Sequence, residues 1–381
     1  MEDATLWSGG NRLKILITGN MGYVGPSVVK ELRRVYPSAV LVGFDMGYFA
    51  HCLTTRAPLA ECHTDVQHFG DVRKLPESFL EGVDAIVHLA ALSNDPMRSR
   101  YEEITMDINF RASVELARRA KRAGVRSFAF ASSCSVYGSS ESGPRNEDSP
   151  VNPLTAYARS KVMTETELER LANSHFTVTA LRFATACGMS DRLRLDLVLN
   201  DFVACAVSSG KIMILSDGMP WRPLINVKDM ARAFQWAVGR KNSNGGAFVL
   251  VNAGSNRWNY QVRELAEAVA RVIPDTDVSV NKDAQPDKRS YRVDFSRFES
   301  LAPHHQPAYT LGDTVQELKA GLDAIGFRDP AFREGWMIRL KTLDKHREDG
   351  LLNERLEWSF RALDTAGLAT VAAGLGEQSN P

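Results

Sequence analysis

A phenol and an ammonium stand four residues apart in this sequence, at Tyr157 and Lys161, shortly after the hydroxyl-rich run Ser132-Ser133-Cys134-Ser135. On a helix, residues i and i+4 share one face, so both side chains can reach the same ligand. A free tyrosine has a pKa of about 10, but a neighbouring cation favours the phenolate. Tyr157 could therefore act as a base. The alternative is an exposed helix that carries both residue types by chance, so the pattern needs support from the rest of the chain.

A glycine-rich turn near the N-terminus gives that support. Residues 13–18 predict a short buried strand, glycines follow at positions 19, 22 and 25, and residues 26–35 predict a helix. In this order, bare backbone can approach a pyrophosphate whose charge the helix N-terminus meets. The alternative is an ordinary tight turn. The turn indicates a dinucleotide site.

A second predicted strand, residues 40–45, ends in Asp45. This carboxylate lies about 20 residues beyond the last glycine, where an acidic residue accepts hydrogen bonds from the adenosine ribose. It would repel a 2′-phosphate. The sequence therefore favours NAD over NADP as the cofactor.

Three further segments predict strands of the same sheet. Residues 69–73 follow a presumed third strand, residues 85–91 predict a fourth, and residues 127–131 predict a fifth that ends at the serines. Ligands of open parallel sheets gather at the carboxyl ends of the strands, where these motifs fall. We therefore expect an α/β fold, a Rossmann-type doubly wound parallel sheet with a smaller, discontinuous C-terminal substrate lobe.

With these motifs, the chain resembles the extended short-chain dehydrogenase/reductases, and within them the nucleotide-sugar epimerase/dehydratase group. The resemblance rests on Thr18-Gly19-x-x-Gly22-x-x-Gly25, Asp71-Val72-Arg73, His88-Leu89-Ala90-Ala91, Ser132-Ser133-x-Ser135-Val136-Tyr137-Gly138, Tyr157-x-x-x-Lys161, Leu181-Arg182-Phe183 and the run from Arg222 to Asp229. The resemblance covers roughly residues 13–300, and taken together these motifs are specific to the group.

The resemblance implies a role for each matching position. Ser133, Tyr157 and Lys161 would be catalytic. NAD would be bound by Gly19, Met21, Gly22, Tyr23, Val24, Gly25, Asp45, Asp71, Val72, Leu89, Ala90, Ala91, Asn109, Tyr157 and Lys161, and a nucleotide-diphosphate sugar by Ser93, Ser133, Cys134, Thr185, Asn200, Arg222 and Arg289. Three of these residues could instead have a purely structural role: Asn109 as a packed polar residue, Asn200 as a helix cap and Cys134 as a small buried residue.

The departures from the family pattern narrow the reaction. Dehydratases follow the catalytic threonine with Asp-Glu, but this chain has Cys134-Ser135, so simple 4,6-dehydration is not expected. A second diphosphate arginine is replaced by Ala284, with Arg289 or Arg292 as candidate substitutes. We expect an NAD-dependent epimerase that oxidises C4 transiently. A 4-ketoreductase, a dehydrogenase/decarboxylase, an epimerase at another carbon, and a catalytically silent dinucleotide-binding sensor remain alternatives.

Composition agrees with an enzyme of this kind. The 381 residues are 44% hydrophobic and 24% charged, with a formal net charge of zero, and they predict neither nucleic-acid binding nor membrane association. No signal peptide or membrane span is apparent, so a cytoplasmic location is expected. Five cysteines predict no disulfide framework. No metal site is expected, although His51, Cys52, Cys62 and His63, with His68 nearby, leave zinc as an alternative.

The motifs also divide the chain. Residues 11–185 are expected to form the NAD-binding domain, to which residues 221–260 return, and residues 186–220 and 261–345 to form the substrate lobe. Residues 346–381 predict a C-terminal helix, within 351–360, and a loose tail. Arg192, Arg194 and Arg222 could form a cationic wall for a diphosphate. Helices predicted at 101–123 and 155–173 correspond to the family's dimer seam, which implies a homodimer.

Overall fold

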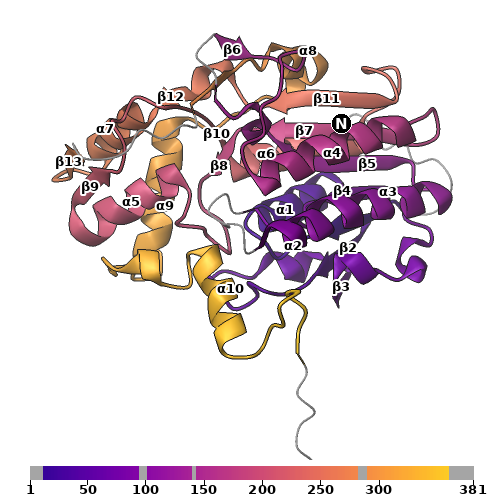
Figure 1. Cartoon of the computed structure of the whole chain (residues 1–381), viewed down its shortest axis with the longest axis horizontal. Helices are drawn as coiled ribbons and strands as arrows, with labels where there is room; N and C mark the ends of the chain where they lie inside the picture. The colour runs from indigo at the N-terminus through magenta and orange to yellow at the C-terminus, as the bar shows by residue number, and fades with distance from the viewer. Residues whose placement is uncertain (1–11, 94–100, 140–142, 282–289, 360–381) are drawn as a thin grey trace, which may run out of the picture.

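A parallel sheet of seven strands forms the centre of the molecule (Figure 1). The computed structural model describes residues 12–93, 101–139, 143–281 and 290–359. The strand order is β11-β7-β5-β4-β1-β2-β3. The strands are β1 (Lys14–Thr18), β2 (Val40–Asp45), β3 (Val66–Phe69), β4 (Ala85–His88), β5 (Ser127–Ser133), β7 (Thr177–Phe183) and β11 (Phe248–Ala253). The predicted Rossmann-type sheet is confirmed.

Helices cover both faces of this sheet, as the continuous apolar strands require. Side chains alternate across β1. Ile15 and Ile17 pack in one cluster with α1 (Gly25–Val35) and α6 (Val227–Gly239), whereas Leu16 packs in another with α3 (Ala112–Arg122) and α4 (Ala156–Leu171). The register of β1 between β2 and β4 brings the carboxyl ends of all three strands to one edge.

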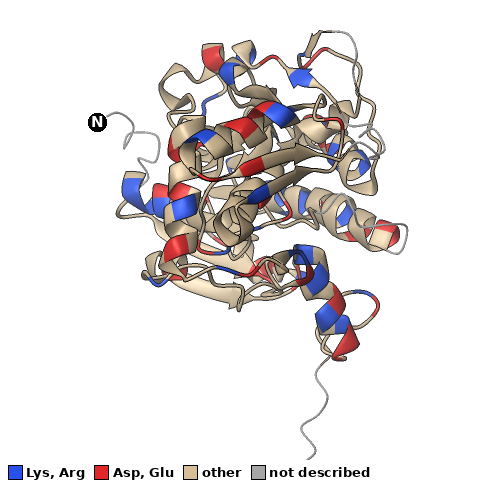
Figure 2. Ribbon diagram, turned by 90° about the vertical axis from the view of Figure 1, so that its left-hand side faces the viewer, with Lys and Arg blue, Asp and Glu red and all other residues tan. Residues whose placement is uncertain are grey.

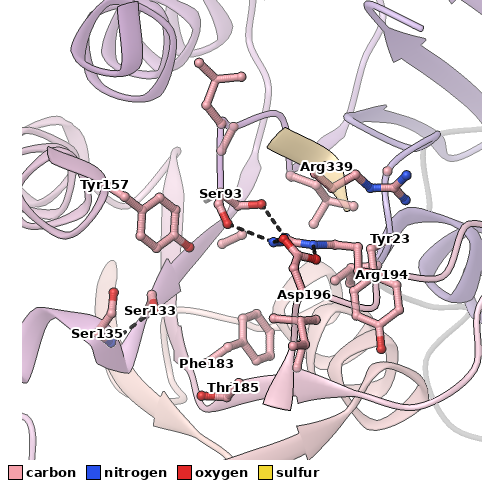
Figure 3. Close-up of a pocket in the computed structure, with 18 of the residues that line it drawn as sticks. Tyr23, Ser93, Ser133, Ser135, Tyr157, Phe183, Thr185, Arg194, Asp196 and Arg339 are labelled. Atoms are coloured by element: carbon pink, nitrogen blue, oxygen red, sulfur yellow. Dashed lines mark hydrogen bonds and ion pairs between the residues drawn. The ribbon is translucent and has the colours of Figure 1, made fainter. Parts of the chain in front are cut away.

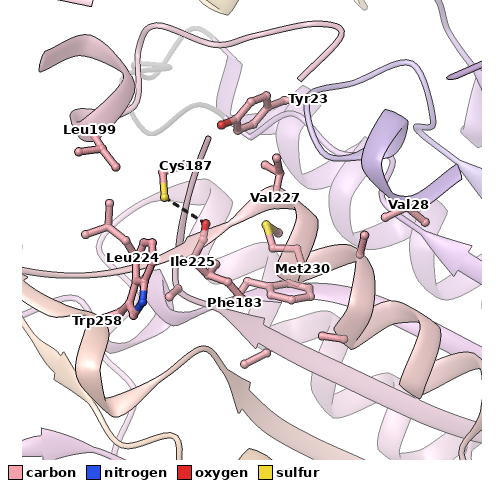
Figure 4. Packing of buried hydrophobic residues seen from close by; sticks show 14 of the residues in the cluster. Tyr23, Val28, Phe183, Cys187, Leu199, Leu224, Ile225, Val227, Met230 and Trp258 are labelled. Carbon is pink, nitrogen blue, oxygen red and sulfur yellow. Dashed lines mark hydrogen bonds between the residues drawn. The ribbon is translucent and has the colours of Figure 1, made fainter. Parts of the chain in front are cut away.

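A second lobe is built from segments that alternate with the main domain. Helices α5 (Val198–Ser209), α7 (Val262–Val272) and α9 (Leu311–Ala324) pack on one another there, beside the two-stranded sheet of β9 (Lys211–Ile214) and β13 (Asp277–Val280). A three-stranded sheet is formed by β12 (Asn259–Gln261), β10 (Trp221–Asn226) and β8 (Thr185–Cys187). Figure 4 shows Phe183 and Met230 of the main domain in the same apolar cluster as Leu199, Leu224 and Trp258. The two lobes therefore share one core.

The remaining regular elements are short or peripheral. They are α2 (Glu102–Met106), β6 (Pro144–Arg145), β14 (Arg292–Val293), α8 (Ser296–Leu301) and α10 (Arg339–Glu348). None of the helices in the described ranges combines the length and apolar character needed to span a bilayer. Figure 2 shows acidic and basic residues interspersed over the side that it views.

The predicted helix at 101–123 is interrupted. A π-helical turn, Asp107–Arg111, separates α2 from α3 and carries the buried Asn109. Such turns are uncommon and frequently occur near functional sites. This turn points the Asn109 amide at the backbone that follows β4, as described below.

The helix predicted within residues 351–360 is wrong. The chain instead makes a turn closed by a bridge between Leu352 and Trp358, with Leu356 at a φ of 56°. The Asn353 side chain accepts hydrogen bonds from the backbone N–H groups of Arg355 and Glu357, each at 2.9 Å. An asparagine that bonds its own backbone competes with helix formation. Residues 360–381 lie outside the described part.

A buried histidine links the sheet to the helices. His88 Nδ1 lies 2.6 Å from Thr18 Oγ1, and its Nε2 lies 2.7 Å from Ser113 Oγ. Burial, with a smaller effect from the Lys161 charge, lowers the pKa of His88 to about 3. His88 is therefore neutral in the folded protein at neutral pH.

We predict that this histidine makes the protein acid-sensitive. Because the pKa of an unfolded histidine is about 6.5, the unfolded state binds the proton first, and stability falls as the pH drops from about 6.5 towards 3. The His88→Asn variant should lose about 1 kcal/mol per pH unit of this dependence between pH 6.5 and 4.5, measured by urea denaturation. His175→Asn, at an exposed position, is the control. An unaltered acid slope in His88→Asn would contradict the assignment.

Candidate active site

A cavity of about 600 Å³ opens at the carboxyl edge of the sheet, between the two lobes (Figure 3). Its walls come from the glycine turn, the ends of the central strands, α4, the segment that leads into α5, β10 and α10. Of the predicted site residues, it is lined by Gly19, Gly22, Tyr23, Val24, Gly25, Asp45, Asp71, Val72, Leu89, Ala90, Ala91, Ser93, Ser133, Tyr157, Lys161, Thr185 and Arg222. Met21, Asn109, Cys134 and Asn200 do not line it, and Arg289 lies outside the described residues.

Helix α4 presents Tyr157 and Lys161 to this cavity. Thr155 caps the helix by accepting a hydrogen bond from the Ala158 N–H at 3.1 Å, so Tyr157 falls in the first turn. Lys161 Nζ lies 5.3 Å from the centroid of the Tyr157 ring and 4.8 Å from that of Phe130. Burial lowers the pKa of Lys161 to about 7, against the opposing effect of Glu165. The phenol therefore has a cationic neighbour that can itself titrate near neutral pH.

The turn after β5 brings two hydroxyl groups to the same wall. Ser133 Oγ accepts a hydrogen bond from the Ser135 N–H at 3.1 Å (Figure 3). Ser135 also lines the cavity, and its buried Oγ has no hydrogen-bond partner among the described residues. A buried hydroxyl without a partner is uncommon in folded proteins. The sequence prediction missed Ser135, although its position two residues beyond Ser133 was a signal.

Cys134, predicted to bind substrate, turns the other way. It is 1% exposed in the core, and its Sγ donates to the Arg182 carbonyl at 3.1 Å. Burial raises the pKa of its thiol well above the usual value. The reason is the alternation of the turn, which sends Ser133 and Ser135 to the cavity and the thiol into the core.

A buried ion pair behind the catalytic helix is a second feature that the sequence prediction missed. Glu165 lies one turn beyond Lys161 and pairs with Arg182 of β7 through contacts of 2.7 and 3.0 Å. Ser132 donates a hydrogen bond to the same carboxylate, and Arg182 Nη1 donates to the Tyr137 hydroxyl at 3.1 Å. The pair fixes α4 against the ends of β5 and β7. The i+4 spacing of positions 157, 161 and 165 was the available signal.

The glycine turn has the close packing that a dinucleotide cradle requires. Gly19 has a φ of +75°, and a Cβ there would lie 2.6 Å from the Ala90 nitrogen. A Cβ on Gly25, at the start of α1, would lie 2.2 Å from the Asn20 oxygen. Gly22 is more open, because a Cβ there would meet only the Gly19 oxygen at 3.2 Å. The bare backbone of the turn thus faces the cavity at a helix N-terminus, which fits a bound diphosphate.

Asp45 completes this half of the cavity. Its Oδ2 accepts from the Met21 N–H at 2.9 Å, and its Oδ1 accepts from the Gly47 N–H at 2.7 Å. Burial raises the pKa of Asp45 despite these two bonds. Met21 therefore acts through its backbone, by holding the carboxylate at the end of β2.

Asn109 and Asn200 hold other parts of the wall instead of lining it. Both are fully buried. The Asn109 amide exchanges two hydrogen bonds with the Leu92 backbone, at 2.8 and 2.9 Å. Asn200 Nδ2 donates to the Tyr23 hydroxyl at 2.9 Å and to the Arg194 carbonyl at 2.8 Å. Asn109 is thus a packed polar residue, as its structural alternative held. Asn200 is not a helix cap, because it lies inside α5, whose N-cap is Leu197, and its amide bonds groups outside the helix.

The predicted cationic wall is smaller than the sequence suggested. Arg192 is 1% exposed and pairs with Glu61 at 2.6 Å, away from the cavity. Arg194 lines the cavity, but its guanidinium is held by Asp196 at 2.9 Å and by Ser93 Oγ at 2.7 Å. Arg222 lines it from β10 and donates to the Trp221 carbonyl at 2.9 Å. Of the three arginines, Arg222 is therefore the best placed to bind a diphosphate.

The residues considered for zinc are not gathered. In the described ranges, no group of three or more His, Cys, Asp or Glu side chains is arranged to hold a metal ion. Cys52 is buried and Cys62 is exposed, while His68 stacks on Phe79 with 4.1 Å between ring centroids.

Residues 15–254, which include the glycine turn, Asp45, Ser133, Tyr157, Lys161 and Arg222, match the model of the NAD dependent epimerase/dehydratase family. The chain belongs to this family. Its cofactor is therefore NAD, in agreement with the fit of the glycine turn and Asp45.

Two relatives show the extent of the similarity. A UDP-glucose 4-epimerase from Azospirillum brasilense is 26% identical over 393 residues, which cover 96% of this chain and 97% of that protein. A dTDP-D-glucose 4,6-dehydratase from Mus musculus is 25% identical over 272 residues, 69% of this chain and 74% of that protein.

Solved structures share the fold. MoeE5 in complex with UDP-glucuronic acid and NAD has a TM-score of 0.69 at 24% identity, covering 81% of this chain and 99% of that one. UDP-glucose-4-epimerase from Stenotrophomonas maltophila, with bound NAD and formylated UDP-arabinopyranose, has a TM-score of 0.68 at 21% identity, covering 83% of this chain and 99% of that one.

The position of Asp45 leads to a prediction on cofactor choice. Asp45→Asn removes the negative charge but keeps oxygen for one of the two backbone bonds, so the turn should stay folded. We expect NAD to bind more weakly and the affinity ratio of NAD to NADP to fall by about tenfold or more, because a charged group no longer opposes the 2′-phosphate. Calorimetric titration of both cofactors measures the ratio. Asp65→Asn, outside the cavity lining, is the control, and an unchanged ratio in Asp45→Asn would remove this carboxylate from the ribose site.

Proposed function

We propose that the protein interconverts C4 epimers of a nucleotide-diphosphate sugar through a transient ketone at C4. The observation that carries the proposal is the meeting of Tyr157, Lys161 and Ser133 on one wall of the cavity that also contains the glycine turn and Asp45. Relatives named UDP-glucose 4-epimerase support it, including one that aligns with nearly the whole chain.

The two halves of the cavity have distinct binding tasks. The glycine turn, Asp45 and the Leu89–Ala91 backbone would hold NAD. The guanidinium of Arg222, on β10, would bind the diphosphate of the sugar nucleotide, for which a planar fork of donors is suited. Thr185 and Ser93 line the space between them and can hydrogen-bond sugar hydroxyls.

Proton transfer would be the task of Tyr157. Its Oη would take the proton of the C4 hydroxyl as the C4–H bond breaks, while the Ser133 Oγ hydrogen-bonds the same oxygen and keeps it in position. Lys161 would stabilise the phenolate. NAD, when bound, supplies the acceptor for the hydride and later its donor. After the ketosugar turns within the cavity, the hydride would return to the opposite face of C4 while Tyr157 returns the proton to the C4 oxygen. The product would then be the C4 epimer, with no net oxidation.

The turn after β5 favours this reaction over dehydration. In the family pattern, dehydratases carry an acid and a base at the two positions after the catalytic hydroxyl. In this chain the first of these positions is Cys134, whose thiol lies in the core, and the second is Ser135. A serine hydroxyl is a poor base at neutral pH without a partner that takes its proton. The turn after β5 therefore supplies no acid and base for the loss of water, and Tyr157 is the base proposed for the C4 hydroxyl.

The test is a product assay on the purified holoenzyme with a panel of UDP, dTDP, GDP and CDP sugars, followed by NMR. We expect at least one sugar nucleotide to equilibrate with its C4 epimer, with no net change in NADH. Net NADH consumption would identify a ketoreductase, and loss of water a dehydratase. Either result, or epimerisation at another carbon, would replace the present proposal.

We also propose that the protein is a homodimer that associates through α3 and α4. The proposal rests on the family resemblance, and the exposed position of Met163 on α4, 42% accessible, is consistent with a covered face.

A further inference from the structure

The C-terminal segment of the described chain crosses back to the NAD-binding domain. We call residues 339–359, which comprise α10 and the following turn, the C-terminal strap. Trp358 Nε1 donates to the Met46 carbonyl at 2.7 Å, and His346 Nε2 lies 2.9 Å from the Tyr48 carbonyl. The Tyr48 hydroxyl donates to the Leu356 carbonyl. The strap is thus attached to the residues that directly follow Asp45.

Arg339, the first residue of α10, reaches the cavity from this strap. It is 4% exposed and lines the cavity together with Leu343, one turn further along. Its guanidinium carbon lies 4.4 Å from the centroid of the Phe49 ring, and Nη2 donates to the Arg192 carbonyl at 2.7 Å. These contacts hold the guanidinium in one place.

The charge of Arg339 is not neutralised within the described part of the chain. Among these residues, no carboxylate lies within ion-pair distance of Arg339, and its buried Nη1 has no hydrogen-bond partner. The Asp196 carboxylate attracts Arg339 from within the same cavity, but it is already paired with Arg194 at 2.9 Å. Burial lowers the pKa of Arg339 to about 10, so the group is still charged at neutral pH. A buried cation without a counter-ion is unfavourable. The geometry therefore calls for an anion in the cavity.

The neighbours of Arg339 indicate which anion this is. Both NAD and a sugar nucleotide carry a diphosphate. Arg339 lies on the same side of the cavity as Tyr23 of the glycine turn, across from Tyr157 (Figure 3). Phe49, on which it stacks, follows Asp45 by four residues. Arg222, the candidate ligand for the substrate diphosphate, comes instead from β10.

We propose that Arg339 binds the diphosphate of NAD, and that the C-terminal strap thereby retains the cofactor between turnovers. This inference rests on NAD being the cofactor, and it adds to the proposed function a reason why a recycled cofactor stays bound. The guanidinium would complete a site whose other donors are the backbone N–H groups of the glycine turn.

The experiment measures NAD directly. Arg339→Met removes the charge but keeps an unbranched side chain to pack on Phe49. We expect its Kd for NAD, measured by calorimetry on protein stripped of cofactor, to rise by about tenfold to a hundredfold, and the exchange of bound NAD for labelled NAD to accelerate correspondingly. Arg339→Lys, which keeps the charge but loses the fork, should fall between this variant and the original protein. Lys345→Met removes an exposed charge from the same helix and should change neither value.

The outcomes separate this inference from the proposed function. Weaker NAD binding in Arg339→Met, with an unchanged KM for the sugar nucleotide at saturating NAD, supports the inference whatever the reaction is. Unchanged NAD binding with a raised KM would assign Arg339 to the substrate diphosphate and overturn it, as would no change in either quantity. If Arg339→Met does not fold, as judged by circular dichroism, Arg339→Lys decides, and its binding NAD as tightly as the original protein would refute the role.

Discussion

Tyr157→Phe should lower kcat by about 10²- to 10⁴-fold, the range expected when a positioned general base is removed. The substitution deletes one oxygen and leaves the ring, so the packing of Lys161 at 5.3 Å from the ring centroid can persist. NAD should still bind, because the glycine turn and Asp45 are untouched. The expected result is therefore a folded, NAD-loaded protein that keeps only a small residual rate of sugar-nucleotide turnover. Product NMR gives the rate, and extraction of the cofactor gives the NAD content.

The chain offers a matched control for this variant. Tyr309 also has a lysine beside its ring, Lys228 at 5.2 Å from the centroid, but it lies outside the cavity lining. Tyr309→Phe should keep the original rate. If Tyr157→Phe retained most of its activity while Tyr309→Phe behaved as expected, another group would have to be the base.

The parts of the site that the sequence predicted are those determined by short stretches of chain. Asp45 could be predicted because it is the last residue of β2. Gly19 could be predicted from the glycine spacing of the turn, which its close approach to Ala90 explains. The spacing of Tyr157 and Lys161 needs only one turn of helix. In each case the motif and its structural context lie within about one strand and one helix, where periodicity and glycine placement are informative.

The features that the sequence did not reveal depend on residues far apart in the chain or on the detailed path of a turn. Arg339 and Asp45 meet the same cavity although nearly 300 positions separate them, and no local pattern marks an arginine in a surface-like helix as buried. Cys134 was predicted to bind substrate and Ser135 was not, and only the course of the turn after β5 shows that Ser135 is the one that faces the cavity. The pairing of Glu165 with Arg182 joins α4 to the next strand, β7, and depends on how the helix packs against the sheet.

The contribution of Lys161 can be separated from that of Tyr157 by pH. Lys161 Nζ lies 5.3 Å from the centroid of the Tyr157 ring, near enough for its positive charge to favour the phenolate. The proposed active state is a phenolate beside an ammonium, and burial lowers the pKa of Lys161 to about 7. This state is the one that can accept the C4 hydroxyl proton.

Removing the ammonium of Lys161 should raise the pH at which the Tyr157 phenolate forms. In Lys161→Met, only the phenol remains, and an isolated tyrosine has a pKa of about 10. We therefore expect the acid limb of the kcat/KM profile to move to higher pH by about 2 units or more, and the rate at pH 7 to fall by about 100-fold or more. Lys161→Arg, which keeps the charge, should leave the limb closer to its original position, and Lys241→Met, outside the cavity lining, should not move it. If the rate of Lys161→Met fell equally at every pH, with the limb in its original place, the lysine would act by positioning the cofactor or substrate instead of by stabilising the phenolate.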